Sequence, residues 1–354
     1  LKITGDRETI VWILKKIEAV FGKLKIDWYA FTNCGIKHVQ DEKTLAITMD
    51  QNDYIKGIKT ISHPDLTSKG PETECVHELH MLYWSVLGAI AYALLTRMDI
   101  AVFVAALQRH SHKPKVIHCK RLNAVVRWAQ RNPKGLYFGA LDDQTRTSGA
   151  LVPTHLRMYS DAAFKKEEDS GHSMRGAVYL RCPGTSEDSF TSSCRCHLVE
   201  HVGKSQRRVV RATYTAELQG ACDTQDKGFL IAQTLHEIET GESAAAIARQ
   251  LRERGGYAVP MTIYIDALSV FASITATFIK TPADNGALCH LLYLRELLDY
   301  GVVAAIVWTD TRDMIADGLT KGSVERDALH ACMNGTITRA HAFKIWKPKR
   351  LLKD

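Results

Sequence analysis

Five apolar, strand-like runs constrain the fold of residues 156–330 more than any other feature of the chain. Short runs rich in β-branched and aromatic residues and bounded by turn residues are typical of strands. Three of the runs follow one another, and helical stretches separate the remaining two. This order is typical of a mixed sheet flanked by helices. The expected strands are 156–160, 176–182, 194–202, 261–265 and 302–308.

Helical periodicity fills the segments between the later strands. Glu217, Leu218 and Ala221, for example, fall on one face of the longest stretch. The sequence therefore predicts an α/β domain with a mixed five-stranded sheet over 156–330, followed by a C-terminal tail over 331–354. The expected helices are 213–238, 243–254, 269–279, 287–300 and one that begins near 313.

The first 140 residues are mostly helical in pattern, with two strand-like runs at 28–31 and 45–49. A polar stretch with Gly149 and Pro153 then interrupts the apolar pattern. We therefore expect an α+β region over 1–140 and a linker over 141–155. The expected helices of the first region are 9–22, 51–61, 81–95, 99–108 and 116–130.

Four acidic residues stand close to the ends of these elements. Asp161 and Asp266 directly follow apolar strand runs, Glu217 lies early on a helix, and Asp317 follows the last strand by a short connection. If the strands at 156–160 and 261–265 are neighbours, the two strand-end aspartates emerge side by side. A single aspartate among 39 acidic residues is usually a solvated surface group. Their joint placement is what favours a shared site.

Clustered carboxylates suit Mg²⁺, a hard cation that prefers oxygen ligands. Phosphodiester hydrolysis commonly uses two divalent ions held about 3.5–4 Å apart by shared carboxylates. We therefore expect two Mg²⁺ ions, or Mn²⁺ in their place. The expected metal ligands and catalytic residues are Asp161, Glu217, Asp266 and Asp317.

The net charge of +7 and the pI near 8.8 fit a polyanionic partner without identifying one. Basic and amide side chains follow the third expected strand and are candidates for contacts to a nucleic-acid backbone, with a solvated basic turn as the alternative. These residues are Lys204, Gln206, Arg207 and Arg208.

The nine cysteines have no repeated spacing, which favours reduced thiols in a cytosolic-type compartment. Cys194, Cys196 and His197 superficially resemble zinc ligands, but no second ligand pair follows at finger spacing, so strand positions are the favoured interpretation. Charged residues interrupt the apolar segment 86–106, and each half is too short to cross a bilayer. We therefore expect no membrane contact and no signal peptide.

Several motifs of the chain resemble the Pol polyprotein of copia-type retrotransposons. In the second half, five segments resemble motifs of the ribonuclease H part, which uses acids in the order Asp, Glu, Asp, Asp. In the first half, three segments resemble the end of the reverse transcriptase. The ribonuclease H segments are Ser160-Asp161-Ala162, Gly203-Lys-Ser-Gln206, Thr213-Tyr-Thr-Ala-Glu217, Ile265-Asp266 and Asp313-Met-Ile-Ala-Asp317-Gly-Leu-Thr-Lys321. The reverse-transcriptase segments are Tyr83-Trp-Ser-Val-Leu-Gly88, Thr96-Arg-Met-Asp-Ile-Ala101 and Arg121–Trp128 with Gly135-Leu136.

This resemblance implies a ribonuclease H-like domain over 156–330, preceded over 1–140 by the last part of the palm, the thumb and the connection. It implies cleavage of the RNA strand of RNA–DNA hybrids by two-metal hydrolysis. The polymerase aspartates would precede Leu1. The implied partners are an RNA–DNA hybrid and the rest of the polyprotein. The implied location is a cytoplasmic virus-like particle, with a nuclear stage left open.

The chain departs from the family pattern at several places. Ala163 and Phe164 replace an Asp and a Trp of the first motif, Ala267 replaces an Asn, and 285–290 lacks the family's basic stretch. A catalytically inactive ribonuclease H-like module that binds nucleic acid or a partner is therefore the alternative function. An integrase core is disfavoured because it uses the order Asp, Asp, Glu, whereas Glu217 precedes the second strand-end aspartate.

Overall fold

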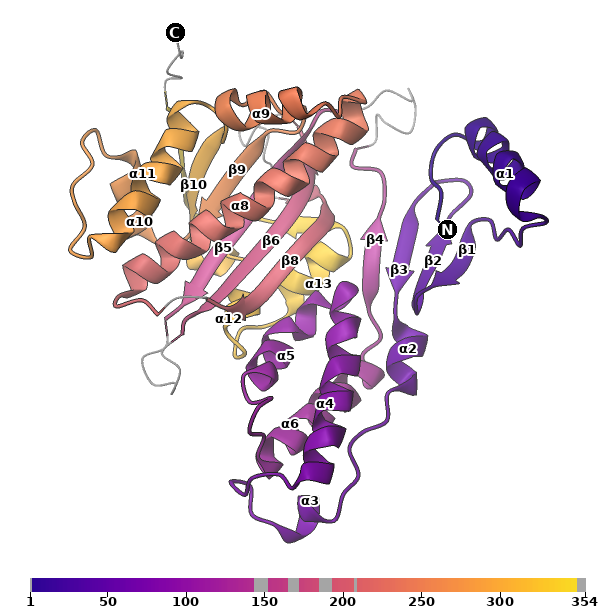
Figure 1. Cartoon of the computed structure of the whole chain (residues 1–354). Helices are drawn as coiled ribbons and strands as arrows, with labels where there is room; N and C mark the ends of the chain where they lie inside the picture. Colours follow the sequence, from indigo (N-terminus) through magenta and orange to yellow (C-terminus); the bar gives the residue numbers. More distant parts are fainter. Residues whose placement is uncertain (1, 143–151, 165–171, 185–192, 207–208, 349–354) are drawn as a thin grey trace.

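The strand β5 (Thr154–Ala163) lies in the interior of a mixed sheet, with neighbours on both sides (Figure 1). The structure is a computed structural model that describes residues 2–142, 152–164, 172–184, 193–206 and 209–348. Within these residues the sheet has six strands in the order β12-β10-β9-β5-β6-β8. The other strands are β6 (Met174–Pro183), β8 (His197–Ser205), β9 (Met261–Ile265), β10 (Ala305–Thr309) and β12 (Phe343–Trp346).

Strand direction changes at β5, which makes the sheet mixed. The strands β5, β6 and β8 are antiparallel neighbours in chain order. On the other side of β5, β9 and β10 run parallel to it. The expected α/β class and mixed sheet are therefore confirmed, and five of the strands overlap the five apolar runs.

The sheet differs from the expectation at one edge. β12 pairs antiparallel with β10, so the segment expected as a separate tail over 331–354 contributes a sixth strand. A second part of this segment, β11 (Thr336–Thr338), pairs with β7 (Ser193–Arg195). Strands of three or four residues give no alternation long enough to predict from the sequence.

Helices cover both faces of the sheet, so that β5 is buried almost throughout. Leu156 and Met158 pack into the core under the long helix, whereas Tyr159 belongs to the core on the opposite face. The first face carries α8 (Thr213–Thr240), α9 (Ala245–Arg254), α10 (Leu268–Thr275) and α11 (Gly286–Asp299). The second carries α12 (Asp317–Thr320) and α13 (Asp327–Met333).

Two glycines let α8 lie close against β5. A Cβ at Gly228 would stand 2.2 Å from the sulfur of Met158, and one at Gly220 would stand 3.5 Å from Ala162 Cβ. The two glycines are eight residues apart, which places them on the same face of the helix. This packing fixes the N-terminal end of α8 beside the end of β5 (Figure 1).

The N-terminal region combines helices with a four-stranded antiparallel sheet in the order β1-β2-β3-β4. Its helices after residue 50 pack around Leu79, Tyr83 and Leu122, which are fully buried, whereas its first helix has no buried residue. The helices are α1 (Arg7–Phe21), α2 (Asn52–Gly57), α3 (Asp65–Ser68), α4 (His77–Tyr92), α5 (Ala101–Gln108) and α6 (Val116–Arg131). The strands are β1 (Ala30–Asn33), β2 (Ile36–Gln40), β3 (Ile47–Asp50) and β4 (Gly135–Phe138).

One helical segment, His77–Leu95, is long and apolar enough to cross a membrane by length and composition alone. Its residues Leu79, Tyr83 and Ile90 are completely buried against the neighbouring helices. Burial in a helical core accounts for these apolar side chains. The absence of membrane contact stays a prediction.

The N-terminal region packs directly on the second face of the sheet. Met98, Ala101 and Leu136 belong to the same core as α12 and α13. Beside them, the fully buried Asp99 accepts two hydrogen bonds of 2.9 Å from Arg97 and lies 3.3 Å from Nε2 of His330. A buried ionic group thus joins the two regions. Most of the expected linker, residues 143–151, lies outside the described residues.

Candidate metal centre

Asp161 and Asp266 are neighbours because β5 and β9 pair in parallel. Ser160 is the partner of Ile265, so the next residue along each strand is an aspartate. Asp161 is 1% exposed, and Asp266 is half-buried. Thr311 donates a hydrogen bond of 2.9 Å to Asp266 Oδ2, and the indole N–H of Trp308 donates to the Asp266 carbonyl. The register of the sheet and the end of β10 therefore fix this pair.

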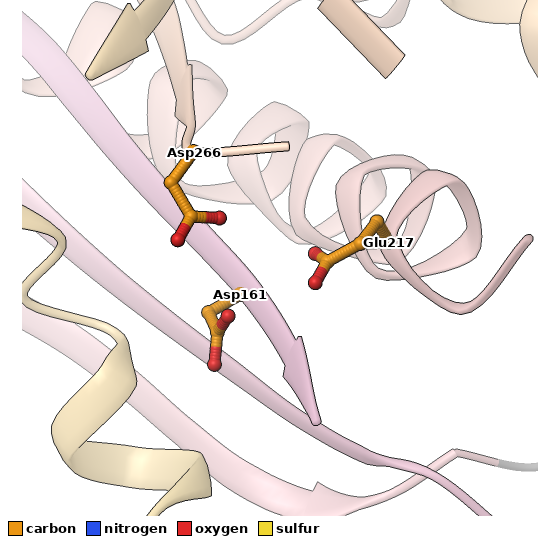
Figure 2. A group of neighbouring side chains, drawn as sticks. All are labelled: Asp161, Glu217 and Asp266. Atoms are coloured by element: carbon orange, nitrogen blue, oxygen red, sulfur yellow. The ribbon is translucent and has the colours of Figure 1, made fainter. Parts of the chain in front are cut away.

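Glu217 reaches the pair from the second turn of α8. The N–H of Ala162 donates a hydrogen bond of 3.1 Å to Glu217 Oε2, and the Glu217 residue is 9% exposed. One oxygen from each of Asp161, Glu217 and Asp266 lies within 4.8 Å of the others. Figure 2 shows the three carboxylates turned toward a common point from two strands and a helix.

Asp317 joins the cluster from the opposite face, on α12. Its carboxylate lies beside that of Asp161: both contact Lys321 Nζ, and after burial the Asp317 charge is the main cause of the raised pKa of Asp161. Thr320, on the same short helix, also donates a hydrogen bond to Asp161. The structure therefore brings together all four acids that the sequence singled out, three as a triad and Asp317 against Asp161.

Gly176 makes this approach of α12 possible. It pairs with Asp161 across β5 and β6. A Cβ at Gly176 would lie 2.6 Å from the carbonyl oxygen of Ala316 and 2.9 Å from Thr320 Cγ2. Only glycine lets the backbone of α12 lie so close to the sheet, so this residue determines how near Asp317 comes to Asp161.

The crowding of carboxylates makes their charged forms unfavourable without a cation. Burial, followed by the nearby carboxylates of Asp161 and Asp266, raises the pKa of Glu217 to about 9. Burial and the Asp317 carboxylate raise the pKa of Asp161 to about 6. Burial is also the main cause of the raised pKa values of Asp266 and Asp317. A bound divalent ion would reverse these shifts, because it favours the charged form of each ligand.

The donor set fits a hard divalent ion. All the converging ligand atoms are carboxylate oxygens, which Mg²⁺, Mn²⁺ and Ca²⁺ prefer. The cysteines and histidines considered as zinc ligands have other partners. Cys196 is buried in the apolar core with Cys332, and the His197 ring is 2.7 Å from the Gly139 carbonyl.

The residues proposed for nucleic-acid contacts have different environments. Lys204 is exposed on β8. Gln206 is 3% exposed and donates a hydrogen bond of 2.7 Å to the Ala216 carbonyl. The expectation of a direct backbone contact is therefore corrected for Gln206, because its amide connects the end of β8 to the start of α8. Arg207 and Arg208 lie outside the described residues.

Sequence reasoning assigned no role to Lys321, although it ends the motif that contains Asp317. Its ammonium nitrogen is 2.7 Å from Asp317 Oδ1 and 3.7 Å from Asp161 Oδ1. The signal that could have identified it is the spacing of four residues from Asp317, which places the two side chains on one helix face.

A separate apolar cavity of about 660 Å³ lies between α5, α6 and the segment 322–326. Its lining includes Phe103, His118 and Trp128 but no acidic residue among the described ones. It therefore lacks the groups for metal-assisted hydrolysis, and the carboxylate cluster is the stronger candidate for a catalytic site.

No protein-family model matches the chain, and no curated protein or solved structure matches it either.

Proposed function

We propose that this chain is the C-terminal part of a copia-type reverse transcriptase whose ribonuclease H-like domain cleaves the RNA strand of RNA–DNA hybrids. The observation that carries the proposal is the convergence of Asp161, Glu217 and Asp266 on one point, with Asp317 against Asp161. The order of these acids along the chain and their sites on strand, helix, strand end and helix match the family resemblance. The composition of the chain alone does not require these four acids to be neighbours.

The strand order supports the ribonuclease H-like fold. An antiparallel meander of β5, β6 and β8 is extended on the other side of β5 by the parallel strands β9 and β10. This arrangement agrees with the mixed five-stranded sheet flanked by helices that the resemblance implies. Helices α8 and α9 follow β8, α10 and α11 follow β9, and β12 is an additional edge strand.

The residues of the cluster suit metal-assisted hydrolysis. A divalent ion bound there would polarise the scissile phosphate and lower the pKa of a bound water molecule. Asp161, Glu217 and Asp266 would hold the ion through oxygen atoms that are already close together. Thr311 and the Ala162 N–H, which donate to Asp266 and Glu217, keep these carboxylates oriented. Asp317 completes the site from the other face of the sheet.

The substrate would be recognised by shape rather than by base sequence. Proteins read A-form-like duplexes through phosphates and 2′-hydroxyl groups across the minor groove. The net charge of +7 and the exposed Lys204 on β8 support binding to a polyanion. The rest of the Pol polyprotein is the second partner that the proposal includes, with a cytoplasmic virus-like particle as its location.

Hydrolysis of a labelled RNA–DNA hybrid in Mg²⁺ tests the proposal directly. We expect cleavage of the RNA strand alone, its loss with a chelator, and no cleavage of duplex DNA. The alternative of an inactive binding module predicts that the chain binds the hybrid tightly while both it and the Glu217→Gln variant leave the RNA intact. Strand transfer on duplex DNA would instead indicate an integrase-type core.

A further inference from the structure

The fourth acid of the cluster already has a cationic partner within the chain. Lys321 Nζ is 2.7 Å from Asp317 Oδ1 and 3.7 Å from Asp161 Oδ1. The oxygen atoms that lie within 4.8 Å of one another belong instead to Asp161, Glu217 and Asp266. The cluster therefore has two parts that share Asp161: the triad of Asp161, Glu217 and Asp266, and an Asp161–Asp317 edge that the Lys321 ammonium contacts directly.

We infer that the centre binds a single divalent ion, at Asp161, Glu217 and Asp266, and that the Lys321 ammonium supplies the second positive charge at the Asp161–Asp317 edge. This inference rests on the proposed function and refines it, because the sequence led us to expect two ions. The second ion is replaced by a residue of the chain.

Neighbouring residues hold Lys321 in its position. Its backbone N–H donates to the Asp317 carbonyl at 2.9 Å, which ends α12. Its own carbonyl accepts a hydrogen bond of 3.0 Å from Arg326 Nη2. The close contact of α12 with Gly176 then places the side chain against Asp161. The Lys321 side chain is 38% exposed, so its ammonium is reachable by a substrate phosphate.

A second divalent ion at the same edge would compete with this ammonium. An ion coordinated to Asp317 Oδ1 at about 2.1 Å would lie within roughly 5 Å of the lysine nitrogen, and the two cations would repel each other. An ammonium group has three N–H donors. Two can face Asp161 and Asp317, and the third can donate to a phosphate oxygen of the scissile group, as a point charge rather than as a metal ligand.

Counting bound Mn²⁺ by electron paramagnetic resonance tests the inference separately from catalysis. The titration would use the full chain alone and the chain saturated with a hybrid whose RNA strand carries 2′-O-methyl groups. We expect one Mn²⁺ per wild-type chain in both states. We expect two per chain for Lys321→Met with hybrid, because removing the ammonium frees the Asp161–Asp317 edge. Two ions, or none, in the wild type overturn the inference, as does an unchanged count in the variant.

Two further variants keep this experiment interpretable. Lys321→Arg retains the positive charge and should bind one Mn²⁺. Lys227→Met removes a lysine that pairs with Glu200 at 2.8 Å outside the cluster, and it should leave the count unchanged. Thermal denaturation checks that each variant folds. If Lys321→Met does not fold, a count of two for Lys321→Arg or for the wild type still overturns the inference.

Hydrolysis adds a distinguishable readout. At low Mg²⁺ we expect Lys321→Met to lose on the order of 10–100-fold in rate, as for other groups that support a metal centre. High Mg²⁺ should restore part of this loss. A wild-type chain that binds two ions and cleaves the hybrid contradicts the inference but not the proposed function. A chain that binds one ion without cleaving contradicts the function alone.

Discussion

Two buried acidic sites in this protein have opposite electrostatic environments. In the Arg97–Asp99–His330 group, hydrogen bonds from His330 and Arg97 outweigh burial and lower the pKa of Asp99 to about 2. In the candidate metal centre, burial and neighbouring carboxylates raise the pKa of Asp161 to about 6 and of Glu217 to about 9. The first group is neutralised from within the chain. The second holds protons at pH values where free carboxyl groups are charged, and a bound cation would displace them.

The comparison separates a structural role from a functional one. Asp99 is as buried as Asp161, so burial alone does not mark a catalytic carboxylate. What distinguishes the candidate metal centre is that four acids gather beside one lysine, Lys321. Strongly shifted acids gathered at one place are a recognised indicator of a functional site.

The largest expected effect is that of Glu217→Gln on hydrolysis. Losing one ligand of the ion should remove several kcal/mol of transition-state stabilisation, a rate loss of roughly a thousandfold. Single-turnover cleavage of a labelled hybrid would measure it. The control is Glu237→Gln on the same helix, whose carboxylate accepts from Gln233. A wild-type rate for Glu217→Gln would remove Glu217 from the site.

Asp99→Asn should reduce stability instead of acting on the metal. Removing one partner of a buried ion pair leaves Arg97 uncompensated, at a cost of roughly 3–5 kcal/mol. Chemical denaturation would measure the change, and Mn²⁺ binding to the folded fraction should stay as in the wild type. The destabilisation should be smaller in the double variant Arg97→Met, Asp99→Leu than in the single variant Asp99→Asn. An additive loss would contradict this electrostatic account.

The two groups should give opposite pH dependences of stability. Because the folded pKa values of Asp161 and Glu217 are raised above 3.8 and 4.5, their contribution is fully present below about pH 4 and is lost as pH rises through about 6 and 9. The slope approaches about 1.4 kcal/mol per pH unit for each proton held by the folded chain alone. Asp99 contributes above pH 3.8, and this contribution is lost as pH falls toward 2.

Thermal denaturation of the metal-free chain between pH 5 and pH 9 measures this dependence. The buried His118 and His155, whose pKa is lowered to about 4, add stability as pH rises, so the effect of the acids is measured as the difference from Glu217→Gln. We expect the melting temperature of the wild type to fall relative to that of Glu217→Gln as pH rises, and Mg²⁺ to reduce this difference. An equal pH dependence of the two proteins would contradict the assigned shifts.

A smaller effect is expected from Gly176→Ala, which moves α12 without touching a carboxylate. The added methyl group would overlap Ala316 and Thr320, and overpacking of this kind costs about 1–3 kcal/mol. We expect weaker Mn²⁺ binding and slower hydrolysis as well, measured by titration and single-turnover cleavage. Gly203→Ala is the matched control, since its Cβ would stand 3.3 Å from Leu319 O and should have a milder effect. Equal effects would show that the approach of α12 does not set the site.

The sequence predicted those parts of the molecule that depend on local pattern. The strands β5 and β9 were predicted because they are buried and strongly apolar, and their parallel pairing then places Asp161 beside Asp266. The short strands β2 and β12 were missed because runs of four or five residues have no distinct period. Their pairing depends on distant partners rather than on their own residues.

The sequence alone also did not reveal which polar residues are buried. Gln206 belongs to a motif that suggested a contact to a nucleic-acid backbone. Its side chain is instead buried, where its amide donates a hydrogen bond to the Ala216 carbonyl. Lys321 was visible in its motif, but its place between Asp161 and Asp317 depends on how far α12 approaches the sheet. Such distances are set by the absence of a side chain at Gly176, which no helical or strand period reveals.

The Arg97–Asp99–His330 contact has a consequence for any duplex that the chain handles. Pulling the N-terminal helices away from the sheet would break the contact of His330 with Asp99 and expose Met98 and Ala101, which share an apolar core with α12 and α13. The two regions are therefore expected to move as one rigid unit. Under the proposed function, a hybrid bound by the N-terminal helices would be held at a constant distance from the catalytic carboxylates. The RNA would then be cut at a fixed number of nucleotides from the place where the N-terminal helices bind the hybrid.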